Sequence, residues 1–171
     1  PYIKRKKVFY MGNFKKVSPI LVLILNVVEV LQILGAVFFT GALALFTVVQ
    51  ITKPDIITTE MKKLSLSSQE SFILLICLII NCISLFLVAR FTKQIFQWIE
   101  ISESPFIPKI SNQINKISAA LFVYIVVPID SVNEINISSV VLGIVIVLVL
   151  YCLSAVFKYG CSLQKEVDGM L

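Results

Sequence analysis

A polar stripe interrupts the first long apolar run of the chain, and it is the main candidate for chemistry. Glu29 is the only acidic residue deep in a predicted membrane span, and Asn26 and Gln32 lie near it on the same side of a helix. An ionisable group in a span costs about 2.5–3.5 kcal/mol on insertion scales and is by default a sign of function. One interpretation is therefore a site for an ion, a proton or a polar ligand. The alternative is that Glu29 is protonated or paired and holds the helices together, with Asn81 as a candidate partner.

The residue types on which most enzymes depend are missing from the chain. It contains no histidine, and its four cysteines include no CxxC pair. It also has no glycine-rich phosphate loop, no GxSxG and no paired-carboxylate motif. We therefore expect no catalytic residue, no metal site and no cofactor, and we do not expect an enzyme.

The composition indicates a membrane protein. Of the 171 residues, 58% are hydrophobic and only 15% are charged, and the mean hydropathy is +0.95. A soluble domain usually has about 25% charged residues, and a domain of this size could not hide so much apolar surface from water. The expected fold class is all-α: a polytopic membrane protein with four transmembrane helices in a four-helix bundle, forming a single domain over residues 1–171.

The apolar runs set the expected spans at residues 20–49, 71–90, 112–130 and 138–157. A hydrocarbon core of about 30 Å takes about 20 helical residues, so the first run must tilt or project beyond the bilayer. The third apolar core, residues 119–129, is too short alone and needs polar residues that precede it. Of the four predicted spans, it depends most on the residues that flank its apolar core.

Helical periodicity continues past the second and fourth spans. Phe91, Ile95 and Ile99 continue one stripe. The other stripe begins at the end of the fourth span and continues along a predicted tail helix at 158–170, and it consists of Val156, Gly160, Leu163, Val167 and Met170. Such stripes need partners in water, so we expect a cytoplasmic helical layer in which Leu163 and Val167 pack on Ile110 or Ile114.

The distribution of positive charge predicts the orientation. Twelve of the 15 Lys and Arg residues flank one side of the predicted spans, whereas only Lys53, Lys62 and Lys63 flank the other. The positive-inside rule then predicts a multi-pass protein of the cell membrane with both termini in the cytoplasm. The basic N-terminal residues could also bind anionic lipid headgroups.

Two stretches carry a family resemblance. The tail VFKYGCSLQKEVD, at residues 156–168, resembles the closing signature of a bacterial family of small four-span membrane proteins, domain of unknown function 2975. Ser104-Pro105-Phe106 and Asn115-Lys116-Ile117 look like the Pro-Phe and Asn-containing segment of that family. Cys161 and Ser162 depart from the small and acidic pair usual there.

Both stretches are predicted to lie on the cytoplasmic side, where we expect them to touch and form a clasp. The clasp is either structural or a docking surface for a partner. Its candidate residues are Pro105, Phe106, Asn115, Phe157, Gly160, Leu163, Gln164, Glu166 and Asp168. Members of the family are often encoded beside a small helix-turn-helix regulator, so the resemblance implies a role in membrane-linked regulation.

The expected function is therefore a regulatory or protein-interaction role at the cytoplasmic membrane. The expected partners are the lipid bilayer and either a small helix-turn-helix regulator or a membrane complex, without direct binding of nucleic acid. Small residues at packing spacing would serve a homodimer or packing within one chain: Ala36, Thr40, Ala44, Ser139 and Gly143. The alternative functions are a transporter, channel or ligand-binding bundle that uses Glu29, and an immunity protein against a membrane-active peptide.

Overall fold

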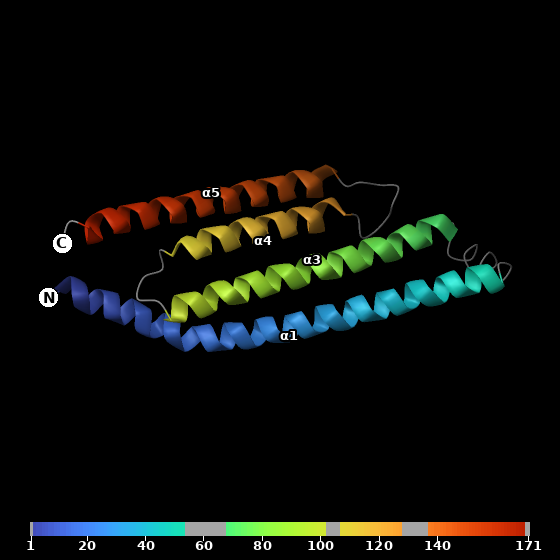
Figure 1. The fold of residues 1–171 in the computed structure, drawn as a ribbon, viewed down its shortest axis with the longest axis horizontal. Coiled ribbons are helices and arrows are strands. Elements are labelled where there is room, and N and C mark those ends of the chain that lie inside the picture. Colours follow the sequence, from blue (N-terminus) through green and yellow to red (C-terminus); the bar gives the residue numbers. More distant parts are fainter. Residues whose placement is uncertain (1, 54–67, 102–106, 128–136, 170–171) are drawn as a thin grey trace.

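The part of the chain that the structure describes forms four α-helices that run alternately up and down (Figure 1). The structure is a computed structural model, and it describes residues 2–53, 68–101, 107–127 and 137–169, with no side-chain description for residues 2–17, 68, 139 and 168. The helices are α1 (Tyr2–Thr52), α3 (Ser68–Ile101), α4 (Pro108–Val126) and α5 (Ile137–Asp168). The all-α class is confirmed. The start of α1 and the end of α5 lie at the same end of the molecule.

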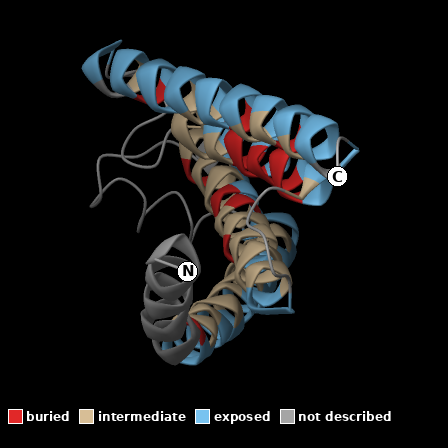
Figure 2. Ribbon diagram, turned by 90° about the vertical axis from the view of Figure 1, so that its left-hand side faces the viewer, coloured by how far each residue is buried: buried red, intermediate tan, exposed pale blue. Residues whose placement is uncertain are grey.

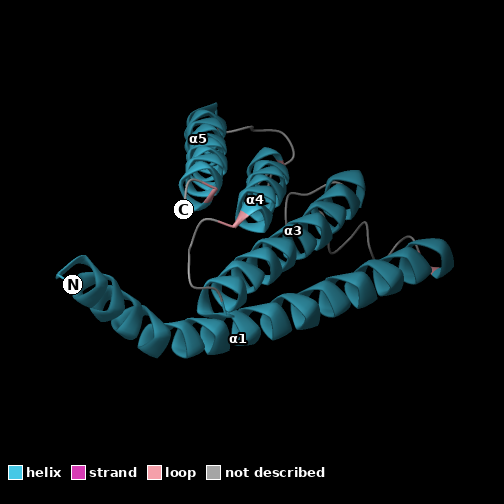
Figure 3. Cartoon of the chain, turned by 60° about the vertical axis from the view of Figure 1, so that its left-hand side comes forward, coloured by secondary structure: helices cyan, strands magenta, loops and turns pink. Residues whose placement is uncertain are grey.

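Helix α1 is longer than the predicted first span at both ends. Its 51 residues correspond to about 77 Å of helix, more than twice the hydrocarbon thickness of a bilayer. Pro19 lies inside the helix, where its ring removes a backbone hydrogen bond and clashes with the preceding turn. Figure 3 shows α1 bent in its N-terminal part, as expected for a helix with a proline at this position.

The two predicted extensions are helical, whereas their cytoplasmic location stays a prediction. α3 continues without a break to Ile101, and α5 continues to Asp168. The tail predicted at 158–170 is therefore the last part of α5. The periodic apolar positions in each extension keep the helix period, and no proline or glycine pair interrupts it before the end.

The four described helices lie in a row and do not surround a common core. α1 contacts α3, α3 contacts α4, and α4 contacts α5, whereas α1 and α5 each contact one neighbour within the described residues. Figures 2 and 3 show this open arrangement, with α1 and α5 at its two edges. A membrane protein has little hydrophobic drive to close such a row, because lipid tails cover apolar helix faces as well as leucine does.

The two hairpins of the row are also displaced along its length. At the end opposite the termini, α1 and α3 project well beyond the ends of α4 and α5 (Figure 1). The apolar stretches of the two helix pairs are therefore not level with each other.

Helix α4 is one of the two inner helices of the row, and among the described helices it holds the largest share of the buried residues (Figure 2). Three of these are polar: Ser111, Gln113 and Ser118. The Ser118 hydroxyl donates to the Val147 carbonyl on one side at 3.3 Å, and the Gln113 amide donates to Gln94 on the other. The buried polar side chains of α4 thus have protein partners on both sides of the helix.

Three of the described helices are long and apolar enough to cross a membrane. Their candidate spans are Ser18–Thr52, Gln69–Ile101 and Val140–Val167, which contain the predicted spans 20–49 and 71–90 and most of 138–157. A membrane protein is therefore supported. The predicted third span, 112–130, corresponds to α4, which is not among the three, and its last residues lie outside the described part of the chain.

Close helix packing explains one small residue of the predicted set. Gly143 of α5 is buried, and a Cβ atom added there would overlap the side chain of Ile125 on α4. This glycine therefore serves packing within the chain. Thr40 and Ala44 of α1 are exposed, and Gly41 beside them has nothing within 4 Å of an added Cβ.

The two glycines provide a matched pair for a stability test. Both Gly143→Ala and Gly41→Ala gain the same helix propensity, but only the first must displace Ile125. We expect Gly143→Ala to be less stable than Gly41→Ala by about 1–3 kcal/mol, the usual cost of overpacking. Unfolding in mixed detergent micelles, followed by the fluorescence of the single Trp98, measures the difference. Equal stability of the two variants would contradict the α4–α5 packing.

Candidate functional site

An ion pair between Glu29 of α1 and Lys93 of α3 is the principal feature of the predicted polar stripe. The Lys93 Nζ atom lies 3.0 Å from the Glu29 Oε2 atom and donates a hydrogen bond to it. The side chains are 15% exposed for Glu29 and 24% exposed for Lys93. The pair joins the two helices of the first hairpin at a largely desolvated position. Here a hydrogen-bonded counter-ion offsets the cost of burying charge.

The antiparallel register explains why these two residues meet. Ser18 bonds Glu100 across the same interface, and Gly35 packs against Cys82 further along it. Along this interface Lys93 does not lie directly opposite Glu29. It is displaced by about one helical turn toward the Ser18–Glu100 contact. Side chains lean toward the N-terminus of their own helix, so Glu29 and Lys93 lean toward each other.

The four residues of the predicted intramembrane cluster do not come together. Glu29 and Gln32 are half-buried, but Asn26 is exposed, so the expected inward-facing stripe is wrong for Asn26. The partner expected for Glu29 is also wrong. Asn81 is buried, and its Nδ2 atom donates to the backbone carbonyl of Val127 at 3.4 Å, which joins α3 to the end of α4.

Three buried acceptors have no hydrogen-bond partner among the described residues. They are the Oε1 atom of Glu29, the Oδ1 atom of Asn81 and the Oε1 atom of Gln113. Within the described chain, no group of three His, Cys, Asp or Glu side chains is placed to hold a metal ion. The geometry at Glu29 thus provides an inter-helix clamp with one unused carboxylate oxygen.

Several residues of the predicted clasp lie outside what the structure describes. Pro105 and Phe106 are not described, and the side chain of Asp168 is not either. The predicted contact of Gln164, Glu166 and Asp168 with the loop at 104–106 therefore stays a prediction. Of the remaining clasp residues, Asn115, Leu163 and Glu166 are exposed, whereas Phe157, Gly160 and Gln164 are half-buried.

The predicted packing of the tail stripe on α4 is wrong. Leu163 is 43% exposed and Val167 is 56% exposed, although Ile110 and Ile114 of α4 are buried. Another face of α5 contacts α4. Apart from Gly160, its buried and half-buried residues step alternately by three and four: Val140, Gly143, Val147, Leu150, Ser154, Phe157, Cys161 and Gln164.

A buried serine pair, which the sequence analysis missed, fixes this α4–α5 contact. The hydroxyl oxygens of Ser111 and Ser154 lie 2.8 Å apart, and each hydroxyl also reaches the backbone carbonyl of the other residue, at 3.1 and 3.0 Å. Small residues mark close helix contacts in membranes, and Gly143, Ser154 and Cys161 share one heptad face. The spacing of these three small residues was the feature of the sequence from which this contact could have been predicted.

Comparison of the chain with family models, with curated proteins and with solved structures found no match. The resemblance to domain of unknown function 2975 therefore stays a prediction. The assignment of a function depends on the geometry described above.

A charge-removal cycle tests the Glu29–Lys93 clamp. We expect Lys93→Gln to destabilise the fold by about 2–3 kcal/mol, because it leaves the Glu29 carboxylate buried without its counter-ion. Glu29→Gln should cost less, since the flexible Lys93 stem can carry its charge toward water. The double variant should recover part of the loss, with a coupling of about 0.5–3 kcal/mol. Trp98 fluorescence during detergent unfolding gives these values.

Asn26→Leu is the control for this cycle, because Asn26 lies about one turn away and is exposed. It should change stability by less than about 0.5 kcal/mol. Additive single effects of Glu29→Gln and Lys93→Gln would show that the two charges do not interact.

Proposed function

We propose that this is a four-span protein of the bacterial plasma membrane, with both termini in the cytoplasm, that acts there by binding another protein. The charge bias supports the orientation, because twelve of the 15 Lys and Arg residues flank one side. The placement of the start of α1 and the end of α5 at one end of the molecule agrees with it. We refer to this end as the inner end.

The fourth crossing in this proposal is α4. Its 19 residues measure about 28 Å, close to the thickness of the hydrocarbon core. Its polar side chains would be costly against lipid, but they bond to α3 and α5, which lie on either side. A helix shielded in this way need not be as apolar as the three that face lipid.

The observation that carries the proposed role is an exposed apolar stripe at the inner end of α5. We define the α5 stripe as Val156, Tyr159, Leu163 and Val167, which share one helix face and are 63%, 65%, 43% and 56% exposed. A bilayer span of about 20 residues that begins near Ile137 ends near Val156, so most of the stripe projects beyond the hydrocarbon. Contiguous apolar surface outside lipid marks interaction sites.

An amphipathic helix of a cytoplasmic protein is the occupant that fits this stripe best. The stripe is linear and follows the helix repeat, so a partner helix can contact it along two turns. Lys158 and Lys165 lie on the opposite face of α5, so the stripe itself is uncharged and would meet the apolar face of the partner helix. The resemblance to domain of unknown function 2975 would make that partner a small helix-turn-helix regulator.

Transport through Glu29 receives less support than an interaction role. The carboxylate is engaged by Lys93 in a contact between two helices, and its geometry is that of a structural pair. The described helices form an open row, so α5 does not approach this pair. Glu29 is thus accounted for by the stability of the first hairpin.

Topology reporters test the four crossings. Alkaline phosphatase fused after residue 60 or after residue 133 should be active, because these positions are proposed to lie outside the cytoplasm. Fusions after residue 103 or 171 should be inactive as phosphatase but fluorescent with green fluorescent protein. If α4 does not cross, the fusions at 103 and 133 will report the same side, and the C-terminal fusion will change sides.

Site-directed photocrosslinking in intact cells tests the α5 stripe. A photoreactive phenylalanine at Leu163 should form one discrete adduct with a cytoplasmic protein, and the same probe at Ser162 should not, because Ser162 lies on another face of α5. Val167→Ser should lower the yield at position 163 about fivefold or more. Adducts with lipid alone at position 163, or the same protein adduct from both positions, would refute the docking stripe.

The predicted clasp gives a separate outcome. Gln164→Ala/Glu166→Ala should leave the adduct at position 163 unchanged if the stripe binds the partner. If this double variant loses the adduct at position 163 while Val167→Ser retains it, docking is assigned to the clasp residues instead.

A further inference from the structure

A polar groove lies between α4 and α5 at the inner end, on a different face of α5 from the stripe. Its volume is about 590 Å³. The residues of its lining that matter most are Ser111, Asn112, Asn115, Ser154, Lys158 and Lys165. No acidic residue is among the residues that line it; Glu166 follows Lys165 in the chain but is not part of the lining.

The floor of the groove is closed and its rim carries the donors. Ser111 and Ser154 use their hydroxyls on each other, as described above. Lys158 and Lys165 lie seven residues apart, so both ammonium groups rise from the same side of α5. Asn112 and Asn115 offer side-chain amides from the facing helix, and all four rim residues are exposed. The rim thus offers two cations and two neutral donors across one opening.

The start of α4 adds positive potential to the same opening. Pro108, the first residue of α4, lines the groove, and the preceding Ile107 makes no side-chain capping bond. The first turn of α4 contains no acidic residue. Pro108 has no backbone N–H and the Ile110 N–H donates to the Ile107 carbonyl, so the contribution of this 19-residue helix is its dipole, whose positive end favours an anion.

Neighbouring contacts indicate the depth of the groove relative to the bilayer. Lys109, beside Pro108, lies over the ring of Trp98 with Nζ 5.8 Å from the ring centre. Lys116 lies over the ring of Phe91 at 5.5 Å, one turn beyond the groove residue Asn112. Tryptophan and lysine prefer the interface between hydrocarbon and water. The open end of the groove, at Pro108, is therefore level with the headgroups of the inner leaflet, and its floor lies at the edge of the hydrocarbon.

We propose that this groove binds a phosphate group, supplied either by an anionic phospholipid headgroup or by free phosphate. Phosphate matches two lysines, two amides and a helix N-terminus, and basic pockets between transmembrane helices bind such headgroups. The proposal goes beyond the protein-binding role, because the groove lies on a different face of α5 from the stripe. It rests on the proposed orientation only for the statement that the leaflet is the inner one. Its test in detergent solution does not depend on the docking stripe.

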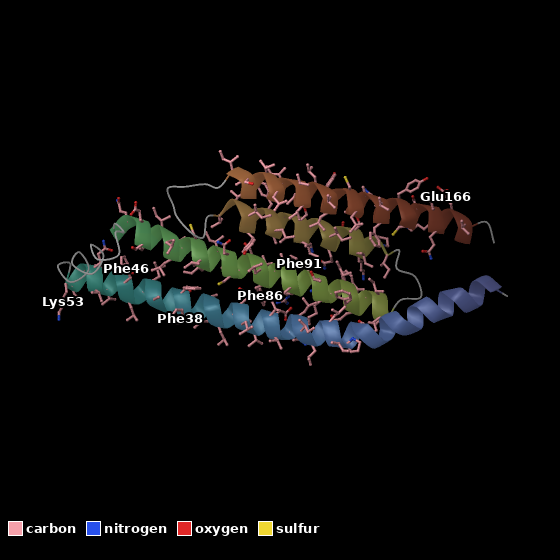
Figure 4. The ribbon with its side chains drawn as sticks, turned by 180° about the vertical axis from the view of Figure 1, so that it is seen from behind. Phe38, Phe46, Lys53, Phe86, Phe91 and Glu166 are labelled. Carbon is pink, nitrogen blue, oxygen red and sulfur yellow. The ribbon has the colours of Figure 1, made fainter. Side chains whose placement is uncertain are left out.

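Native mass spectrometry of the detergent-purified full chain provides the lipid arm of the test. Phosphatidylglycerol should bind with higher affinity than phosphatidylcholine. Lys158→Gln and Lys165→Gln should each weaken phosphatidylglycerol binding about fivefold, and the double variant more than tenfold. Lys158→Arg/Lys165→Arg should retain binding, because it retains both charges. The control is Lys53→Gln, which removes one exposed lysine at the opposite end of the molecule from Glu166 and the groove (Figure 4).

Inorganic phosphate provides the second arm, with the line width of its ³¹P resonance measured against protein concentration. Binding of phosphate that is lost in Lys158→Gln/Lys165→Gln, without a preference for phosphatidylglycerol, assigns the groove to a free anion. Preference for phosphatidylglycerol with weak phosphate binding assigns it to lipid. The proposal is overturned if neither ligand responds to the two lysines, or if Lys53→Gln weakens binding as much as Lys158→Gln.

Discussion

The polar side chains of α4 are the constraint on which the arrangement of the helices depends. Ser111, Gln113 and Ser118 are buried in the middle of a chain that is 58% hydrophobic, and lipid offers none of them a hydrogen bond. α4 must therefore have protein on both sides, and α3 and α5 supply a side-chain amide, a hydroxyl and backbone carbonyls. The two outer helices carry no such requirement over their apolar faces. Lipid can solvate them, and the row stays open at α1 and α5.

Much of the helical architecture could be predicted from the sequence, because unbroken apolar runs and the helix period are local properties. The runs at 20–49, 71–90 and 138–157 indicated three of the helices, and the periodic positions after Ala89 and Phe157 indicated that α3 and α5 continue. Their arrangement in a row could not be predicted in this way. It depends on which helix has polar groups that need two neighbours, and a bundle was assumed because four spans usually form one.

The candidate site was less predictable, because apolar periodicity does not say whether a face meets protein or lipid. In α5 the apolar residues Val156, Leu163 and Val167 face away from the protein, and the contact with α4 uses another face, which combines Gly143, Ser154 and Cys161 with larger residues such as Leu150 and Phe157. The small residues on that face permit close backbone approach, so the apolar stripe alone did not identify the contact. Lys93 was counted only as an orientation signal. Its pairing with Glu29 requires the register of α1 against α3, which no local pattern in either helix contains.

The displacement of the two hairpins has a consequence for the bilayer itself. The helix pair α1 and α3 projects beyond α4 and α5 at the end opposite the termini, so the two edges of the row present apolar surface at different heights. A flat membrane of uniform thickness cannot match both edges at once, and tilting, local thinning or local thickening must absorb the difference. Lipids beside α1 and lipids beside α5 thus experience different hydrophobic thicknesses. The molecule acts as a wedge, and its resting tilt depends on the thickness of the bilayer around it.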